Sequence, residues 1–175
     1  MKETVALFVS VNPAETSHTL LRRAASLLTG SDESEFDTAK AAQGKPYFPA
    51  HSGLHFSVSH SGDYWICAFA SREIGCDIQL HTEPKRPDAI VNRYFHPAEQ
   101  AVYAASEDKP AAFHRIWCRK EAAVKRTGHG IDRTFAETDT TSPDCGVTDL
   151  VLPGADGYSC AIAYDGEFVV DIRYL

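Results

Sequence analysis

The sequence lacks the short motifs of several common site types. It contains no C-x-x-C pair, no G-x-x-x-x-G-K-[ST] loop, no G-x-G-x-x-G fingerprint and no G-x-S-x-G elbow. These absences argue against a zinc knuckle, a P-loop NTPase, a Rossmann dinucleotide site and an α/β-hydrolase serine, respectively. Any indication of function must therefore come from the order and spacing of less specific features.

Long apolar runs and paired cysteines are also missing. The first apolar run spans only Val5 to Val11, which is too short for a membrane span, and no small-residue cleavage site follows it. The five cysteines are odd in number, as expected for reduced thiols rather than a disulfide framework. A net charge of −7 argues against a general nucleic-acid binder. We therefore expect a cytoplasmic protein that binds neither a membrane nor nucleic acid.

Hydrophobic periodicity predicts strands and helices in mixed order. A strand over residues 5–11 precedes a helix within residues 15–30, for which Gly30 is a natural stop. The later predicted elements are strands over 54–60, 64–70 and 73–80, helices over 87–95, 96–107 and 109–128, and strands over 146–152, 158–164 and 167–175. Tight turns are expected to join the first three of these strands into an antiparallel meander. Asp165-Gly166 is expected to form a hairpin turn between the last two strands.

This order of elements indicates an α+β fold with antiparallel sheets and packed helices. Strand, helix and strands are followed by helices and strands, which fits two α+β halves that meet near residues 80–86. We expect an N-terminal half over residues 1–84 and a C-terminal half over residues 85–175.

One predicted strand carries a candidate metal ligand. In IGCDIQ, residues 74–79, Asp77 and Gln79 are two positions apart and share one face of the strand. A carboxylate beside an amide oxygen offers the hard ligands that Mg²⁺ prefers. Taken alone, a solvent-facing aspartate on an edge strand is the simpler interpretation.

The predicted helix over residues 109–128 surrounds a single acid with basic residues. Residues 109–126 carry six bases, and Glu121 is their only acid. Trp117, Glu121 and Lys125 recur at helical spacing and therefore share a face. A surface Glu–Lys pair beside a core tryptophan explains this pattern, and so does a metal-binding Glu121 with Lys125 at a phosphate. Position alone leaves both interpretations open.

Two further segments suit an anion. In SVSHS, residues 57–61, Ser59 and His60 bring a hydroxyl and an imidazole to the end of a strand, where a structural hairpin end or a nucleophilic serine are the alternatives. The segment Gly44-Lys45-Pro46 adds a lysine on a backbone that the proline keeps extended.

Taken in order, GKP, SVSHSG, GCDIQ, YFHPAEQ and WCRKEAAVK closely resemble the motif series of the Sfp-type 4′-phosphopantetheinyl transferases, W-x-x-K-E-A subgroup. The resemblance covers about residues 44–130. It implies a monomer of two similar α+β halves related by pseudo-two-fold symmetry, with coenzyme A (CoA) and Mg²⁺, or Mn²⁺, in the cleft between them. It also implies transfer of 4′-phosphopantetheine from CoA to a serine of an apo acyl or peptidyl carrier protein, with release of 3′,5′-ADP. Such transfer serves fatty-acid, polyketide or nonribosomal peptide biosynthesis.

The resemblance assigns roles to individual residues. Asp77 and Glu121 match the metal-binding carboxylates, and Gln79 would join them directly or through water. Asp77, Glu121 and Lys125 match the catalytic group, in which Lys125 lies at the CoA pyrophosphate. The other implied contacts with CoA, at its adenine, 3′-phosphate or pyrophosphate, are Thr19, Gly44, Lys45, Pro46, Ser59, His60, Glu99 and Lys120.

Three alternatives accompany this interpretation. Many relatives have a second carboxylate at the position of Gln79, which favours a CoA-binding family member without transferase turnover as the main alternative. A different Mg²⁺-dependent phosphoryl enzyme, such as a pyrophosphatase acting on CoA, would release products with no carrier protein present. A structural or assembly factor would be indifferent to loss of Glu121 beyond its effect on stability.

Overall fold

The computed structural model describes residues 2–131 and 133–175. In chain order its strands and α-helices are β1 (Glu3–Val11), α1 (Ser17–Thr29), β2 (Ala39–Lys40), β3 (Pro46–Tyr47), β4 (His55–Ser61), β5 (Tyr64–Ala70), β6 (Gly75–Leu80), α2 (Pro87–Tyr94), α3 (Pro97–Ala105), α4 (Lys109–Thr127), α5 (Arg133–Glu137), β7 (Val147–Leu150), β8 (Tyr158–Ala163) and β9 (Phe168–Tyr174). Short 3₁₀ helices lie at Glu33–Glu35, Pro49–His51 and Pro143–Cys145. The predicted α+β fold with antiparallel sheets and packed helices is confirmed.

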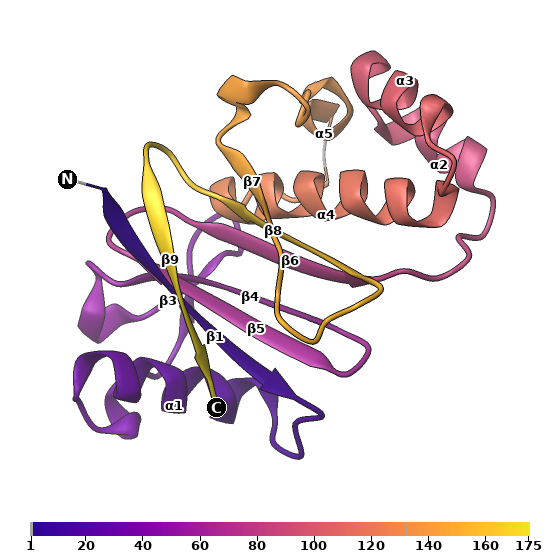
Figure 1. The fold of residues 1–175 in the computed structure, drawn as a ribbon. Helices are drawn as coiled ribbons and strands as arrows, with labels where there is room; N and C mark the ends of the chain where they lie inside the picture. Colours follow the sequence, from indigo (N-terminus) through magenta and orange to yellow (C-terminus); the bar gives the residue numbers. More distant parts are fainter. Residues whose placement is uncertain (1, 132) are drawn as a thin grey trace.

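The four-stranded sheet is ordered β4-β5-β1-β9. It lies between α1 on one side and the three-stranded sheet β6-β8-β7 on the other (Figure 1). Both of its faces are covered, which is why β1 has an almost unbroken buried run. Leu7 on one face packs with strands of the three-stranded sheet. Phe8 on the other face packs with the apolar side of α1. The helix α1 ends at Gly30 in a left-handed conformation, as the sequence predicts.

The three-stranded sheet is ordered β6-β8-β7, and α4 lies along it (Figure 1). Two predicted strand pairings are wrong. The third strand of the predicted meander, β6, pairs with β8 and not with β5. The turn at Asp165-Gly166 does not close a hairpin, because β9 pairs in parallel with β1 instead of with β8. Short turns show where a strand ends, but the partner of each strand is decided by tertiary packing.

Strand β6 cannot continue the meander because both edges of β5 are already paired, one with β4 and the other with β1, and serine side chains join β6 to β4 instead. Strand β6 runs alongside β4, but hydroxyls of β4 take the place of backbone acceptors. Ser57 Oγ accepts from the Cys76 N–H at 3.0 Å, and Ser61 Oγ accepts from the Leu80 N–H at 3.0 Å. Ser59 Oγ receives a longer bond of 3.4 Å from the Ile78 N–H. The SVSHS segment therefore joins the two sheets through its alternate serines.

Helix α4 lies directly against β6 because small residues line the contact. Cys118 and Ala122 of α4 pack on Ala161 and Ala163 of β8 with almost no exposure. The closest approach is at Gly75, where a Cβ would overlap the carbonyl oxygen of Ala122 and lie 2.5 Å from the amide nitrogen of Arg126. Among the residues that the structure describes, no helix combines the length and apolar character needed to cross a membrane.

Replacing Gly75 with alanine is expected to lower the free energy of unfolding by about 2–3 kcal/mol, because the new methyl group meets helix backbone that cannot rotate away. Urea denaturation of wild type and Gly75→Ala measures the effect. Gly53→Ala is the matched control, since a Cβ at Gly53 meets nothing within 4 Å. Equal stability of the two variants would contradict the close contact of α4 with β6.

Candidate functional site

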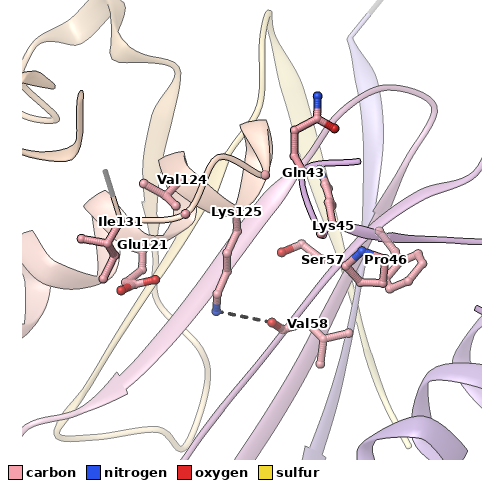
Figure 2. A pocket seen from close by; sticks show the side chains of 13 residues that line it. Gln43, Lys45, Pro46, Ser57, Val58, Glu121, Val124, Lys125 and Ile131 are labelled. Carbon is pink, nitrogen blue, oxygen red and sulfur yellow. Dashed lines mark hydrogen bonds between the residues drawn. The ribbon is translucent and has the colours of Figure 1, made fainter. Parts of the chain in front are cut away.

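A cavity of about 390 Å³ opens between the C-terminal end of α4, strand β4 and the loop before β3. It brings together segments that are far apart in the sequence (Figure 2). The residues that line it are Gln43, Gly44, Lys45, Pro46, Phe56, Ser57, Val58, Glu121, Val124, Lys125, Gly128, Gly130 and Ile131. Five of the predicted site residues, namely Gly44, Lys45, Pro46, Glu121 and Lys125, therefore share one cavity.

Asp77 lies beside this cavity on β6, and its side chain is only 2% exposed. Its Oδ1 accepts from Ser59 Oγ at 2.6 Å and from Lys125 Nζ at 2.7 Å. Its Oδ2 accepts from Gln79 Nε2 at 2.8 Å. The predicted pairing of Asp77 and Gln79 on one strand face is confirmed, with the amide nitrogen directed at the carboxylate.

Lys125 connects Asp77 to the cavity. Its side chain is 30% exposed, and its ammonium also lies 3.4 Å from the Val58 carbonyl oxygen (Figure 2). Burial is the largest single influence on the pKa of Lys125 and lowers it, but the charge and hydrogen bond of Asp77 act together with Cys76 and Glu121 and leave the pKa above its ordinary value. Lys125 is therefore charged at all physiological pH values.

Glu121 lies one helical turn before Lys125 and extends from the same face of α4 (Figure 2). It is half-buried, and within the described residues its carboxylate receives no hydrogen bond. Burial raises the pKa of Glu121, the nearby Asp77 charge raises it further, and Lys125 opposes both. A carboxylate with these properties has free capacity to accept a proton or to bind a cation.

The donors around the cavity fit Mg²⁺ better than a softer metal. Asp77 and Glu121 are close enough for the charge of one to raise the pKa of the other. In residues 2–131 and 133–175, no group of three or more His, Cys, Asp or Glu side chains could hold a metal ion. Mg²⁺ needs fewer protein ligands, because it binds one or two carboxylates and completes its shell with water and phosphate.

Lys120 and Glu99 form a buried ion pair away from the cavity. Lys120 Nζ donates to Glu99 Oε2 at 2.9 Å and to the Thr138 carbonyl oxygen at 2.7 Å. Glu99 also accepts from the N–H groups of His96 and Thr140 and from the Thr140 hydroxyl. The two side chains are 1% and 0% exposed. The structure places both residues in an internal network, and their predicted contact with CoA stays a prediction.

His60 and Thr19 also lie outside the lining of this cavity. Because side chains alternate along β4, His60 is on the opposite face from Ser59, and it lines a separate cavity of about 470 Å³ together with Ser17. Thr19 is in the first turn of α1, where its hydroxyl lies 2.9 Å from that of Thr16. The structure therefore brings Ser59, but not His60 or Thr19, to Asp77, and the predicted contacts of all three with CoA stay predictions.

Lys45 lines the cavity, but its ammonium is held by the protein. It donates to the Ile74 carbonyl oxygen at 3.0 Å and to the Arg126 carbonyl oxygen at 2.8 Å, and it forms an ion pair with Glu73. Lys45 therefore fastens its loop to the end of α4. Sequence reasoning missed this role, and also missed the apolar wall of Val58, Val124 and Ile131, because neither has a local signal.

The arginines of the basic block have carboxylate partners elsewhere. Arg115 and Arg119 form ion pairs with Asp149, and Arg126 pairs with Asp165. Of the six bases in residues 109–126, only Lys125 is among the described residues that line the cavity.

The sequence matches the model of the 4′-phosphopantetheinyl transferase superfamily over residues 73–172. It is 33% identical over 152 residues to a 4′-phosphopantetheinyl transferase of Bacillus subtilis, covering 85% of this chain and 66% of that protein. It is 39% identical over 104 residues to the 4′-phosphopantetheinyl transferase AcpT of Salmonella typhimurium, with 58% of this chain and 54% of the relative covered. The similarity to 4′-phosphopantetheinyl transferase Sfp of B. subtilis is 34% over 102 residues, covering 57% and 45%. The chain thus spans about half to two thirds of the length of these relatives.

Replacing Lys120 with methionine is expected to lower the free energy of unfolding by about 3–5 kcal/mol, because Glu99 is left buried without its countercharge. Adding Glu99→Gln should recover part of the loss. Arg115→Met is the control, since it breaks a more exposed ion pair worth about 0–1 kcal/mol. If Lys120 served only as a ligand of CoA, Lys120→Met would retain wild-type stability.

Replacing Glu121 with glutamine is expected to remove a pH-dependent loss of stability. The folded protein holds the proton of Glu121 above the ordinary pKa of 4.5, so ionisation destabilises the native state as pH rises through the interval up to the raised pKa. The unfolding free energy of wild type minus that of Glu121→Gln should fall across this interval and then stay constant. Urea denaturation from about pH 4 to about pH 8 measures it. The same difference for the exposed Glu107→Gln serves as control, and an equal slope there would contradict the assignment.

Proposed function

This chain belongs to the 4′-phosphopantetheinyl transferase superfamily, and from that premise we propose that it transfers the 4′-phosphopantetheine group of CoA to a serine of an apo acyl or peptidyl carrier protein. The observation that carries the proposal is the cavity that joins Gly44-Lys45-Pro46 to Glu121 and Lys125 next to Asp77. These residues come from separate segments, and all belong to the motifs whose order first indicated this family. Their convergence supports a common ligand.

We also propose that the chain divides into two halves, each of which contributes one strand to the sheet of the other, since β6 pairs with β8 and β9 pairs with β1. The cavity is lined by residues 43–58 from the proposed N-terminal half, 1–84, and by residues 121–131 from the proposed C-terminal half, 85–175. CoA would occupy the space between them, with its pyrophosphate toward Lys125 and its adenine toward Gly44-Lys45-Pro46. The apolar wall suits the adenine and the arm of CoA, since ligand pockets are mostly apolar with few polar anchors.

Asp77 and Glu121 would hold Mg²⁺, or Mn²⁺ in its place, and Gln79 would contribute through its amide oxygen or through water. When bound, the metal neutralises charge on the pyrophosphate. These residues are favoured because Glu121 lines the cavity with free acceptor capacity and the negative charge of Asp77 raises its pKa. Gln79 needs only to turn its amide to present oxygen instead of nitrogen to the same region.

The reaction has one bond formed and one broken. The serine oxygen of the carrier forms a bond to the phosphorus that bears pantetheine, and the bridging P–O bond of the pyrophosphate breaks. The electron pair of that bond leaves with 3′,5′-ADP, whose developing charge Lys125 stabilises. Glu121 would accept the serine proton, because its carboxylate lines the cavity and receives no hydrogen bond within the described residues.

The partners of the proposed reaction are CoA and the carrier protein, and we propose that the enzyme acts as a monomer in the cytoplasm. The alternative function is CoA binding without turnover, favoured by the amide at Gln79. A pyrophosphatase acting on CoA would share the same residues but would need no carrier.

Wild-type protein incubated with CoA, Mg²⁺ and a panel of apo carrier proteins should add one phosphopantetheine to at least one carrier, measured by intact-mass spectrometry. Glu121→Gln should reduce the rate by about 10²-fold or more, because it loses both a metal ligand and the proposed base. Its folding is checked independently by the urea denaturation described above.

Two outcomes would contradict the proposal. CoA binding without modification of any carrier would favour the binding-only alternative, with Gln79→Glu as the variant to test next. Release of 3′,5′-ADP in the absence of a carrier would identify a pyrophosphatase.

A further inference from the structure

The carboxylate of Asp77 already has three donors from the protein. Ser59 and Lys125 reach Oδ1 at 2.6 and 2.7 Å, and Gln79 reaches Oδ2 at 2.8 Å. A carboxylate has about four lone-pair directions, and this one is almost completely shielded from solvent. The protein occupies three of these directions, so a cation that binds Asp77 competes with protein donors for the carboxylate oxygens.

Lys125 is the donor that competes most strongly with a cation. Its ammonium is the only positive charge among the three donors, and it repels a divalent ion that approaches the same oxygen. Ser59 and Gln79 are neutral and remain compatible with a metal, the latter after rotation of its amide. The two cations therefore exclude each other at Asp77.

A bound anion in the cavity would stabilise Lys125 in a position away from Asp77. The lysine side chain lines the cavity, is partly exposed and has four rotatable carbon bonds, so it can turn without movement of α4. The other lysine of the cavity wall, Lys45, is fixed by Glu73 and two backbone carbonyls. Lys125 is thus the cation best placed to move to a bound phosphate.

We propose that Lys125 is an internal counter-ion of Asp77 that is exchanged for a divalent cation when a phosphate group takes up its ammonium, so that metal and CoA each favour the binding of the other. The inference rests on the proposed function for the identity of the two ligands. It assigns Lys125 a second role, because the same ammonium that stabilises the pyrophosphate also keeps the metal site closed in the absence of a phosphate ligand. Metal bound without CoA is thereby disfavoured.

The test measures binding of Mn²⁺ alone, with no CoA, from the electron paramagnetic resonance signal of the free ion. Lys125→Met should bind Mn²⁺ at least about tenfold more tightly than wild type, because it removes the competing charge while retaining the length of the side chain. Lys125→Arg keeps the charge and should bind Mn²⁺ weakly, like wild type. If Lys125→Met does not fold, Lys125→Gln provides the neutral side chain.

Arg126→Met is the matched control, since it removes one positive charge from the next position of α4 while its partner is Asp165. Equal tightening in Lys125→Met and Arg126→Met would overturn the exchange and indicate a general effect of charge. Unchanged Mn²⁺ affinity in Lys125→Met would also overturn it. If either result is found and a carrier protein is nevertheless modified, the exchange at Asp77 is wrong and the proposed transferase function still holds. Tighter binding in Lys125→Met alone supports the exchange even if no carrier is modified.

Discussion

The site depends on the direct contact between α4 and β6 at Gly75. No side chain separates the helix from the strand there, so the C-terminal half of α4 lies too close to β6 for even a methyl group to fit between them. Asp77 follows two residues later on β6, and Lys125 lies in the last turns of α4. The ion pair between them forms because this contact brings the two elements together, and the cavity wall containing Glu121 follows from the same geometry. Small residues along α4 extend the contact over the rest of the sheet.

The serines of β4 provide the second constraint. Ser57 and Ser61 satisfy backbone N–H groups of β6 that would otherwise need a neighbouring strand. Ser59 does the same more weakly and also donates to Asp77, so one hydroxyl belongs both to the joint between the sheets and to the site. This dual use links the position of Asp77 to the position of β4, whose edge forms a wall of the cavity.

Much of the fold and part of the site could be predicted from the sequence. Periodicity and caps located the helices, as with Gly30 after α1, because these signals are local. Motif order correctly grouped Gly44-Lys45-Pro46 with Glu121 and Lys125. The strand partners could not be predicted, since an Asp-Gly turn fits a hairpin as well as a change of sheet. The role of Lys45 could not be predicted either, because two of its three acceptors are the backbone carbonyls of Ile74 and Arg126, and the sequence gives no sign of which carbonyls accept a hydrogen bond.

Burial and acceptor count distinguish Lys120 from Lys125, the two lysines of the WCRKEAAVK segment, residues 117–125. Lys120 is enclosed with Glu99, and every oxygen of that carboxylate has donors from the protein, so a change of partner would leave a buried charge unpaired. Such a pair acts as a permanent part of the core. Lys125 faces a carboxylate that is equally buried, but its own ammonium borders an open cavity, where a phosphate can replace Asp77 as its partner. One helix therefore carries two kinds of lysine ion pair. The pair of Lys120, on the side facing α3, is a permanent part of the core, and the pair of Lys125, on the side facing the cavity, can exchange partners. The two lysines differ because the ammonium of Lys125 borders a cavity that can hold another anion, whereas the ammonium of Lys120 is enclosed by protein.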